Sequence, residues 1–393
     1  MRSALNLRYM LHQTTYWAAA AGVMSFASAY LLEQGFAASR VGVLLACGNL
    51  LSCLLQPLLA DRADRSGGAI LLRLMAGLTA MSMACFASLQ LIAMPQWCFG
   101  LVYLLGVFTF DAMMPLMNSV CVAYNNGGAA INYGFCRGIG SLAFSLAALA
   151  IGEAMAGLGA HWMIWISLGL LAGNLAVVLS YPPEGLVTCR KEEQAAESCS
   201  IPVFILRYRW YCVSLLGVML LAMFHAMTEN YLIEVMRRLG GDSGSVGMAL
   251  FVATVVEMPV ILLFDQVRRH IRDNLLLKLA GISFLLKAVL LVLAPSVGAV
   301  YLIQCLQATS YSFLSPTQLY YANAKVDPAD MVKGQAFITA SYTLGCAIGN
   351  FTGGQLLQIS GVELLLWCGV VMAAAGTAVM FLTVDRRDIP REK

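Results

Sequence analysis

Ionisable residues inside long apolar runs are the most chemically informative feature of the sequence. The six deepest are Asp111, Arg137, His225, Glu229, Glu257 and Lys287. A charged side chain at the middle of an apolar layer costs at least about 2.5–3.5 kcal/mol, so each of these residues needs a compensating role. Three of them are carboxylates and two are basic, so the opposite charges nearly balance. We expect these residues to pair with one another, to bind the polar groups of a solute, or to take up and release a proton.

Helical spacing places these residues on shared faces with other polar side chains. The four stripes are Asp111, Pro115 and Asn118; Arg137, Ser141 and Phe144; His225 and Glu229; and Gln304, Gln307 and Tyr311. Each stripe recurs at intervals of three or four residues, the period of one helix face. Polar stripes on otherwise apolar helices are typical of a water-accessible central cavity.

A structural role competes with the functional one at each position. Asp111 and Arg137 could form a buried ion pair that ties two helices together. Lys287 could do no more than neutralise Glu257 from the neighbouring helix. His225 could be a packing residue, Glu229 could reach water, and the stripe around Gln307 could serve interhelical hydrogen bonding.

The amino-acid composition indicates that membrane-spanning helices position these residues. Of the 393 residues, 60% are hydrophobic and 11% are charged, against about 45–50% and about 25% in soluble domains. This excludes soluble enzymes, nucleic-acid binders and disordered scaffolds, and predicts a multi-pass, all-α membrane protein. Apolar runs bounded by turn and charge signals predict twelve transmembrane helices near 10–33, 40–60, 69–92, 98–122, 133–156, 160–181, 208–235, 244–264, 274–294, 297–322, 334–358 and 361–384.

The loops predict two halves and an orientation. The one long polar interruption divides the chain into an N-terminal six-helix bundle (1–181), a cytoplasmic linker (182–207) and a C-terminal six-helix bundle with a short cytoplasmic tail (208–393). Alternating the helices with the N-terminus inside leaves only Arg40, Arg237 and Arg238 on the outer side. The positive-inside rule therefore places both termini in the cytoplasm of a cell membrane.

The sequence carries no sign of a bound cofactor. Most of the 12 Cys lie inside apolar runs, no CxxC pair occurs, and the four His do not fall at zinc-like spacing. The chain also lacks the GxxxxGK[ST] loop that binds ATP phosphates. We expect no metal, no cofactor and no nucleic-acid partner.

The two halves repeat one another. Pro57, Pro115 and Gly134 recur as Pro259, Pro316 and Gly334, at an offset of about 200 residues. Such a parallel duplication of six helices is typical of transporter repeats. Together with "LADRADRSG", in which Asp61 and Arg65 match a conserved loop motif, it makes the chain resemble the major facilitator superfamily. The resemblance implies two pseudo-symmetric six-helix bundles. It also implies that the loops carrying Asp61, Arg65 and Asp265 govern the conformational change.

Within that superfamily, the chain resembles the oligosaccharide/proton symporter branch that includes lactose permease. "YGFCRGIGSLAF" is similar to the branch's Gly-x-x-Arg-x-x-Gly segment, so Arg137 matches its sugar-binding Arg and Phe144 its aromatic residue. Glu257 in "ATVVEMP" matches the segment 8 Glu of the sugar site. The branch's other charged positions differ: Asn118, Gln307 and Ser310, Lys287, and His225 with Thr228 stand at them. Galactoside specificity is therefore not implied.

These features predict a secondary active transporter, not an enzyme, that moves a small polar solute by alternating access with proton symport. A saccharide-like solute is expected. Substrate contacts are predicted for Arg137, Asp111, Asn118, Phe144, Glu257, Gln307 and Tyr311, and proton coupling for Glu257, Lys287, Glu229 and His225. A monomer is expected, with the lipid bilayer, the solute and protons as its partners. An exporter of amphipathic compounds, and a transport-dead sensor or lipid-handling protein, are the alternatives.

Overall fold

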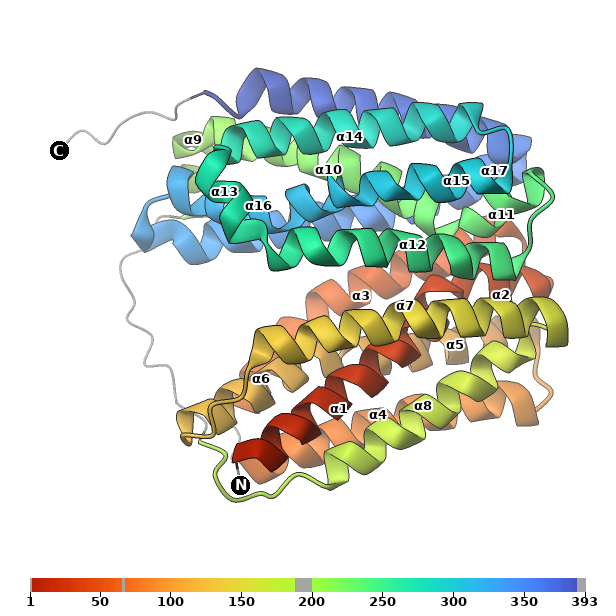
Figure 1. Ribbon diagram of the computed structural model, residues 1–393, viewed down its shortest axis with the longest axis vertical. Helices are drawn as coiled ribbons and strands as arrows, with labels where there is room; N and C mark the ends of the chain where they lie inside the picture. Colours follow the sequence, from red (N-terminus) through yellow and green to blue (C-terminus); the bar gives the residue numbers. More distant parts are fainter. Residues whose placement is uncertain (1, 66–67, 188–199, 387–393) are drawn as a thin grey trace. The chain divides into compact units, whose positions relative to one another are not determined.

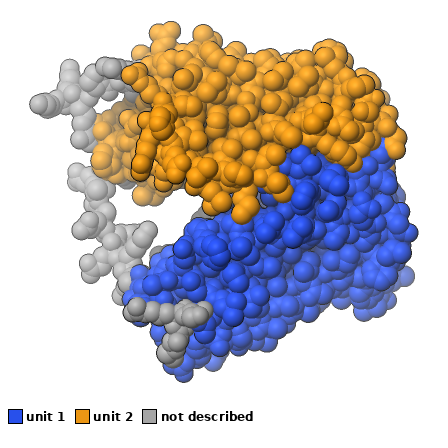
Figure 2. Space-filling model, in the orientation of Figure 1, with its two compact units in different colours: residues 1–192, 241–254 blue, residues 193–240, 255–393 orange. Residues whose placement is uncertain are grey.

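A computed structural model describes residues 2–65, 68–187 and 200–386, except for the side chains of residues 2–3, 55, 57–65 and 68. These residues form helices and turns, and no strand occurs among them. The chain divides into two compact units, coloured separately in Figure 2. Unit 1 comprises residues 1–192 and 241–254, and unit 2 comprises residues 193–240 and 255–393. The predicted all-α fold class is confirmed for the described residues. The boundaries predicted from the polar linker remain predictions.

Unit 1 is built mainly from α1 to α8. Its elements are α1 (Arg2–Ala20), the π-helix η1 (Ala21–Ser25), α2 (Ala27–Glu33), α3 (Ala38–Arg65), α4 (Gly68–Leu91), α5 (Gln96–Asp111), α6 (Met113–Asn126), α7 (Tyr133–Leu158) and α8 (His161–Leu179). α1 packs against both α7 and α8, and α4 packs against α5 (Figure 1). The Asn132 side chain accepts a hydrogen bond from the backbone N–H of Phe135, which caps the start of α7.

Unit 2 contains the remaining helices. They are α9 (Ile201–Arg207), α10 (Arg209–Asn230), α11 (Leu232–Arg238), α13 (Phe264–His270), α14 (Asp273–Leu293), α15 (Val297–Gln304), the 3₁₀ helix η2 (Cys305–Ala308), α16 (Tyr311–Lys325), the 3₁₀ helix η3 (Pro328–Asp330) and α17 (Met331–Thr383). α12 (Ser243–Leu262) begins in unit 1 and ends in unit 2. α17 packs along α10 and α14 (Figure 1).

The ends of helices in unit 2 are tied together by polar contacts. The hydrogen bond from Lys278 in α14 holds the pKa of the Asp385 carboxyl below its usual range, and Asn274 also donates to it.

Gly361, with φ of 72°, kinks α17 at the boundary predicted between the last two segments. Such a backbone angle is readily adopted only by glycine.

Each of the twelve predicted segments is helical, and several carry internal breaks. Eight described helical stretches are long and apolar enough to cross a membrane; two of them, Gln96–Asn126 and Pro328–Thr383, span two successive helical parts. The apolar helices agree with the prediction of a multi-pass membrane protein. The count of twelve crossings remains a prediction.

Candidate functional site

Arg137 in unit 1 lies over an aromatic ring. Its Cζ atom is 3.8 Å from the ring centroid of Trp17 in α1, and its Nη1 donates a hydrogen bond to Ser141 Oγ at 2.6 Å. A guanidinium over a Trp face is attracted by the ring's negative quadrupole. Both side chains are half-buried. The arginine is thus held by α1 and by its own helix, α7.

A chain of hydrogen bonds along α1 fixes the Trp17 ring. Trp17 Nε1 donates to Gln13 Oε1 at 2.9 Å, and Gln13 Nε2 donates to the Tyr9 hydroxyl at 2.8 Å. Gln13 and Tyr9 are fully buried. These three residues were not among those predicted from the sequence. Their spacing at i, i+4 and i+8 on one helix face was the signal that could have identified them.

Asp111 lies where the predicted fourth segment is interrupted between α5 and α6. Pro115 has no N–H to donate to the carbonyl of Asp111 four residues earlier, so that carbonyl lacks its helical partner. Gln56 Nε2 replaces it, lying 3.4 Å from the Asp111 carbonyl oxygen and 3.3 Å from its Oδ2. Asn118 in α6 and Phe144 in α7 are both half-buried. In the structure Asp111 is held by α3.

The buried charges of unit 2 form a second cluster. Lys287 Nζ in α14 donates to Glu229 Oε1 in α10 at 2.7 Å and to Gln307 Oε1 at 2.9 Å. The lysine side chain is 1% exposed and the glutamate 17%. Gln304 Nε2 lies 3.5 Å from Glu229 Oε2. We call these four residues the Glu229–Lys287 cluster.

The partner of Lys287 corrects one expectation. One of the alternatives left open by the sequence was that Lys287 neutralises Glu257 from the neighbouring helix, whereas its carboxylate partner among the described residues is Glu229. The physical reason is the packing of α14 in unit 2. The period of each helix gives the face on which a charge lies, but it does not say which helix that face meets.

A break in the predicted tenth segment positions the two glutamines. α15 ends at Gln304, η2 carries Gln307, and α16 starts at Tyr311. Hydroxyl groups satisfy carbonyls at the break: Ser312 Oγ donates to the Gln307 carbonyl at 3.0 Å, and Thr309 Oγ1 lies 3.3 Å from that of Leu306. Interrupted helices of this kind are tolerated at membrane depth where they are enclosed by protein or line a cavity.

Aromatic rings flank the Glu229–Lys287 cluster. The His225 ring stacks on Tyr311 with centroids 5.3 Å apart and planes at 16°, and meets Phe284 edge-on at 6.0 Å. Its Nδ1 is buried without a hydrogen-bond partner among the described residues. His225 and Glu229 share one face of α10, as predicted from their spacing.

The remaining predicted residues lie elsewhere. Glu257 is half-buried in the part of α12 that belongs to unit 2. Asp265 in α13 accepts a hydrogen bond from the Tyr320 hydroxyl at 3.2 Å. Asp61 and Arg65 fall in the last turns of α3, and their side chains lie outside the described residues. No group of three or more described His, Cys, Asp or Glu side chains is arranged to hold a metal ion.

Apolar helices that carry buried, paired charges and interrupted segments define a polytopic membrane protein of the transporter class. The sequence matches the model of the MFS_1 like family over residues 6–366, and the chain therefore belongs to this family. This confirms the resemblance to the major facilitator superfamily. No curated protein sequence matches the chain.

Solved structures share the fold at low sequence identity. The nucleoside transporter NupG superimposes with a TM-score of 0.80 at 13% identity, covering 96% of this chain and 98% of that one. A POT family peptide transporter in an auto-inhibited state gives 0.72 at 12% identity, covering 99% and 98%. The D-xylose-proton symporter gives 0.70 at 13% identity, covering 96% and 97%.

Proposed function

We propose that this protein is a secondary active transporter that moves a small polar solute by alternating access with proton symport. The observation that carries the proposal is the Glu229–Lys287 cluster, because an ammonium group 1% exposed within apolar helices has a cost that a purely structural span would avoid. The chain crosses a cell membrane twelve times with both termini in the cytoplasm and acts as a monomer.

The proposed solute carries a sugar ring, as in a saccharide or a nucleoside. Arg137 offers guanidinium donors for ring hydroxyls, and the Trp17 face offers a flat apolar surface of the kind on which a ring can lie. Two of the proteins with similar structures are a D-xylose-proton symporter and a nucleoside transporter. Both of those solutes contain a sugar ring.

Thermal unfolding with a solute panel tests this class. Saccharides, nucleosides, aromatic acids and amphipathic compounds are each added to the purified protein, because a ligand that binds only the folded state raises its midpoint. We expect a sugar-containing solute to raise the midpoint by several degrees. Arg137→Gln should abolish that shift, because the hydroxyls that bound the guanidinium lose their charged donor. Arg237→Gln, at an exposed arginine paired with Glu234, is the matched control and should keep it. A shift from amphipathic compounds alone would favour the exporter alternative.

Glu257 is the carboxylate we propose for proton coupling. Glu229 is bound by Lys287 and Gln304, so protonating it means losing an ion pair. Glu257 is the other deep carboxylate of unit 2, half-buried beside Pro259. A half-buried carboxylate within an apolar helix is a candidate for taking up and releasing a proton as its surroundings change.

Glu257→Gln is expected to abolish accumulation driven by a pH gradient while preserving solute exchange between the two sides. Glutamine keeps the size and hydrogen-bonding capacity of the side chain but cannot release a proton. The measurement is uptake and counterflow in proteoliposomes. Gradient-driven accumulation at the wild-type level in Glu257→Gln would remove Glu257 from coupling. Loss of exchange as well would assign it to solute binding.

A further inference from the structure

One edge of the Trp17 ring, which lies beneath Arg137, is enclosed by two helices. Its Nε1 atom donates to Gln13 Oε1 at 2.9 Å, within α1. A Cβ atom added at Gly140 of α7 would lie 2.7 Å from Trp17 Cδ1 and 3.2 Å from the Gln13 carbonyl oxygen. Because Cδ1 and Nε1 are neighbouring atoms of the indole, the hydrogen bond and the glycine act on the same edge of the ring.

Gly140 is the residue of α7 that leaves space for this edge. It is buried, and it follows Arg137 at i+3 on the helix that packs against α1. Small residues let helices in a membrane approach closely, and here the approach brings the Trp17 ring to the guanidinium. A separation of 2.7 Å is shorter than a van der Waals contact. A methyl group at Gly140 therefore requires the ring to move or the two helices to separate.

Gln13 holds the same ring from the side of α1. Its side chain is 0% exposed, and both ends of its amide are bonded. Oε1 accepts from Trp17, and Nε2 donates to the Tyr9 hydroxyl at 2.8 Å. An amide has one acceptor end and one donor end, so the Tyr9 contact fixes which end meets the indole N–H. The ring is thus oriented by a side chain that lies at its edge and not over its face.

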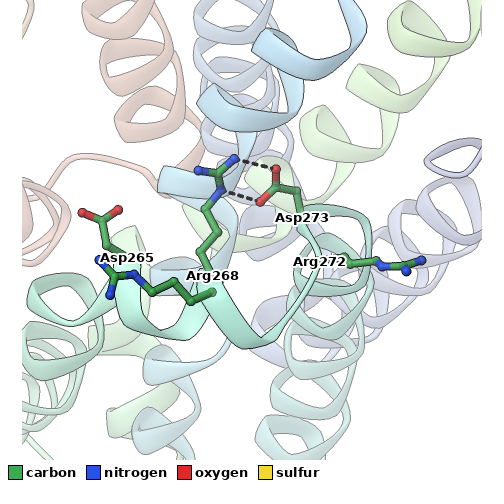
Figure 3. Close-up of a pocket in the computed structure, with 5 residues that line it drawn as sticks. Asp265, Arg268, Arg272 and Asp273 are labelled. Carbon is green, nitrogen blue, oxygen red and sulfur yellow. Dashed lines mark hydrogen bonds and ion pairs between the residues drawn. The ribbon is translucent and has the colours of Figure 1, made fainter.

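A second guanidinium–ring contact, at the polar pocket between α13 and α14, is held differently. Arg268 Cζ lies 3.7 Å from the ring centroid of Tyr320. Arg268 also donates to both carboxylate oxygens of Asp273, at 2.8 and 3.1 Å, as the dashed lines in Figure 3 show. There a forked ion pair fixes the arginine. In unit 1 the ring is the fixed partner, so the position of Arg137 depends on what holds Trp17.

We propose that Gln13 and Gly140 are positioning residues that set the affinity of the protein for its solute. They do so by holding Trp17 under Arg137, and the inference rests on the proposed binding of a sugar ring at that arginine. Both residues are buried between α1 and α7, so neither reaches the solute. A displaced guanidinium donates poorly directed hydrogen bonds to ring hydroxyls, so affinity falls although every contact residue is present.

Binding of D-xylose and of uridine to the purified full-length protein in detergent measures the effect. Gln13→Met keeps a similar side-chain volume but removes both hydrogen bonds, and Gly140→Ala adds the methyl group that meets Trp17. We expect each variant to weaken binding of the tighter of the two probes about tenfold, as for one weakened charge-assisted hydrogen bond. Gly157→Ala is the control on the same helix, because nothing lies within 4 Å of its new Cβ, and it should bind as the wild type does.

Double variants separate positioning from a general loss of structure. Trp17→Phe removes the indole N–H and should weaken binding by itself. Its smaller ring also relieves the overlap with a Cβ atom at Gly140. In the Trp17→Phe background, Gln13→Met and Gly140→Ala should cause no further loss of affinity, because both act through Trp17. A further tenfold loss in that background would overturn the proposal, as would wild-type affinity in both single variants.

The position of Arg137 can also be measured without any solute. In protein with isotope-labelled arginine, the side-chain N–H signal of Arg137 is identified by its absence from Arg137→Gln. The ring current of Trp17 shifts this signal, because the guanidinium lies 3.8 Å from the ring centroid. It should move in Gln13→Met and Gly140→Ala while the signal of Arg268 stays in place, and an unmoved signal would contradict the positioning role. A moved signal without binding of either probe to the wild type would confirm that role and refute the proposed solute class.

Discussion

Replacing Glu229 with glutamine is expected to destabilise the protein by about 3–5 kcal/mol, because it leaves the Lys287 ammonium group buried without its counter-charge. Lys287 is 1% exposed, and its Nζ lies 2.7 Å from Glu229 Oε1. The Gln307 amide oxygen remains as an acceptor at 2.9 Å, but an amide does not neutralise a cation. The thermal unfolding midpoint of the purified protein should fall by several degrees.

A second substitution separates this explanation from simple loss of packing. Glu229→Gln/Lys287→Met removes both charges, so most of the lost stability should return. The control is Arg237→Gln, which breaks an exposed ion pair with Glu234 of the same 2.7 Å length. That exposed pair should change the free energy of unfolding by no more than about 1 kcal/mol. Burial, rather than distance, then accounts for the difference.

The same variants test which carboxylate Lys287 serves. If Lys287→Met restores stability to Glu257→Gln but not to Glu229→Gln, the pairing of α10 with α14 is wrong and the partner suggested by the sequence is right. If Glu229→Gln unfolds at the wild-type temperature, the ammonium group has another counter-charge. Either result would contradict the Glu229–Lys287 cluster.

The sequence predicted where polar groups lie along each helix better than which groups meet. Spacing placed His225 and Glu229 on one face of α10, and its charge within an apolar run marked Lys287 as a candidate. Pairing across helices depends on which faces pack together and on their vertical offset, and a helical period contains neither quantity. The contact between Lys287 and Glu229 could therefore not be predicted from spacing and charge.

Helix breaks were predictable where proline or glycine causes them, as at Pro115 and Gly361. Pro115 marks the interruption after Asp111, because its ring removes a backbone donor. The 3₁₀ turn around Gln307 has no proline within it. Thr309 and Ser312 form it by donating to backbone carbonyls, an ability these residues also have in uninterrupted helices. Such a break cannot be read from residue types alone.

The residues that support Arg137 were also not predicted from the sequence. Tyr9, Gln13 and Trp17 are uncharged, so the cost of burying a charge does not distinguish them within an apolar helix. They matter because the hydrogen bonds between them orient the Trp17 ring beneath the arginine. The resemblance to sugar symporters singled out Arg137 and gave no information about this support from α1.

Gly349 in α17 lies so close to α10 that adding a single methyl group there should have a measurable effect. A Cβ atom at Gly349 would lie 2.8 Å from Met223 Cα of α10 and 3.0 Å from its carbonyl carbon. These are backbone atoms, so no rotamer change can relieve the overlap. Small residues let helices approach closely in a membrane, and α10 and α17 pack together in this way.

Gly349→Ala is therefore expected to lower the free energy of unfolding by about 1–3 kcal/mol, the usual cost of overpacking. Gly298→Ala in α15 is the matched control, because the nearest atom to its new Cβ is Ser296 Oγ at 3.9 Å. Alanine at that helical position should leave stability unchanged or raise it slightly. Thermal unfolding of both variants in the same detergent measures the difference. Equal midpoints would mean that α10 and α17 are farther apart in the protein than this packing requires, and the glycines of α17 would then need another explanation.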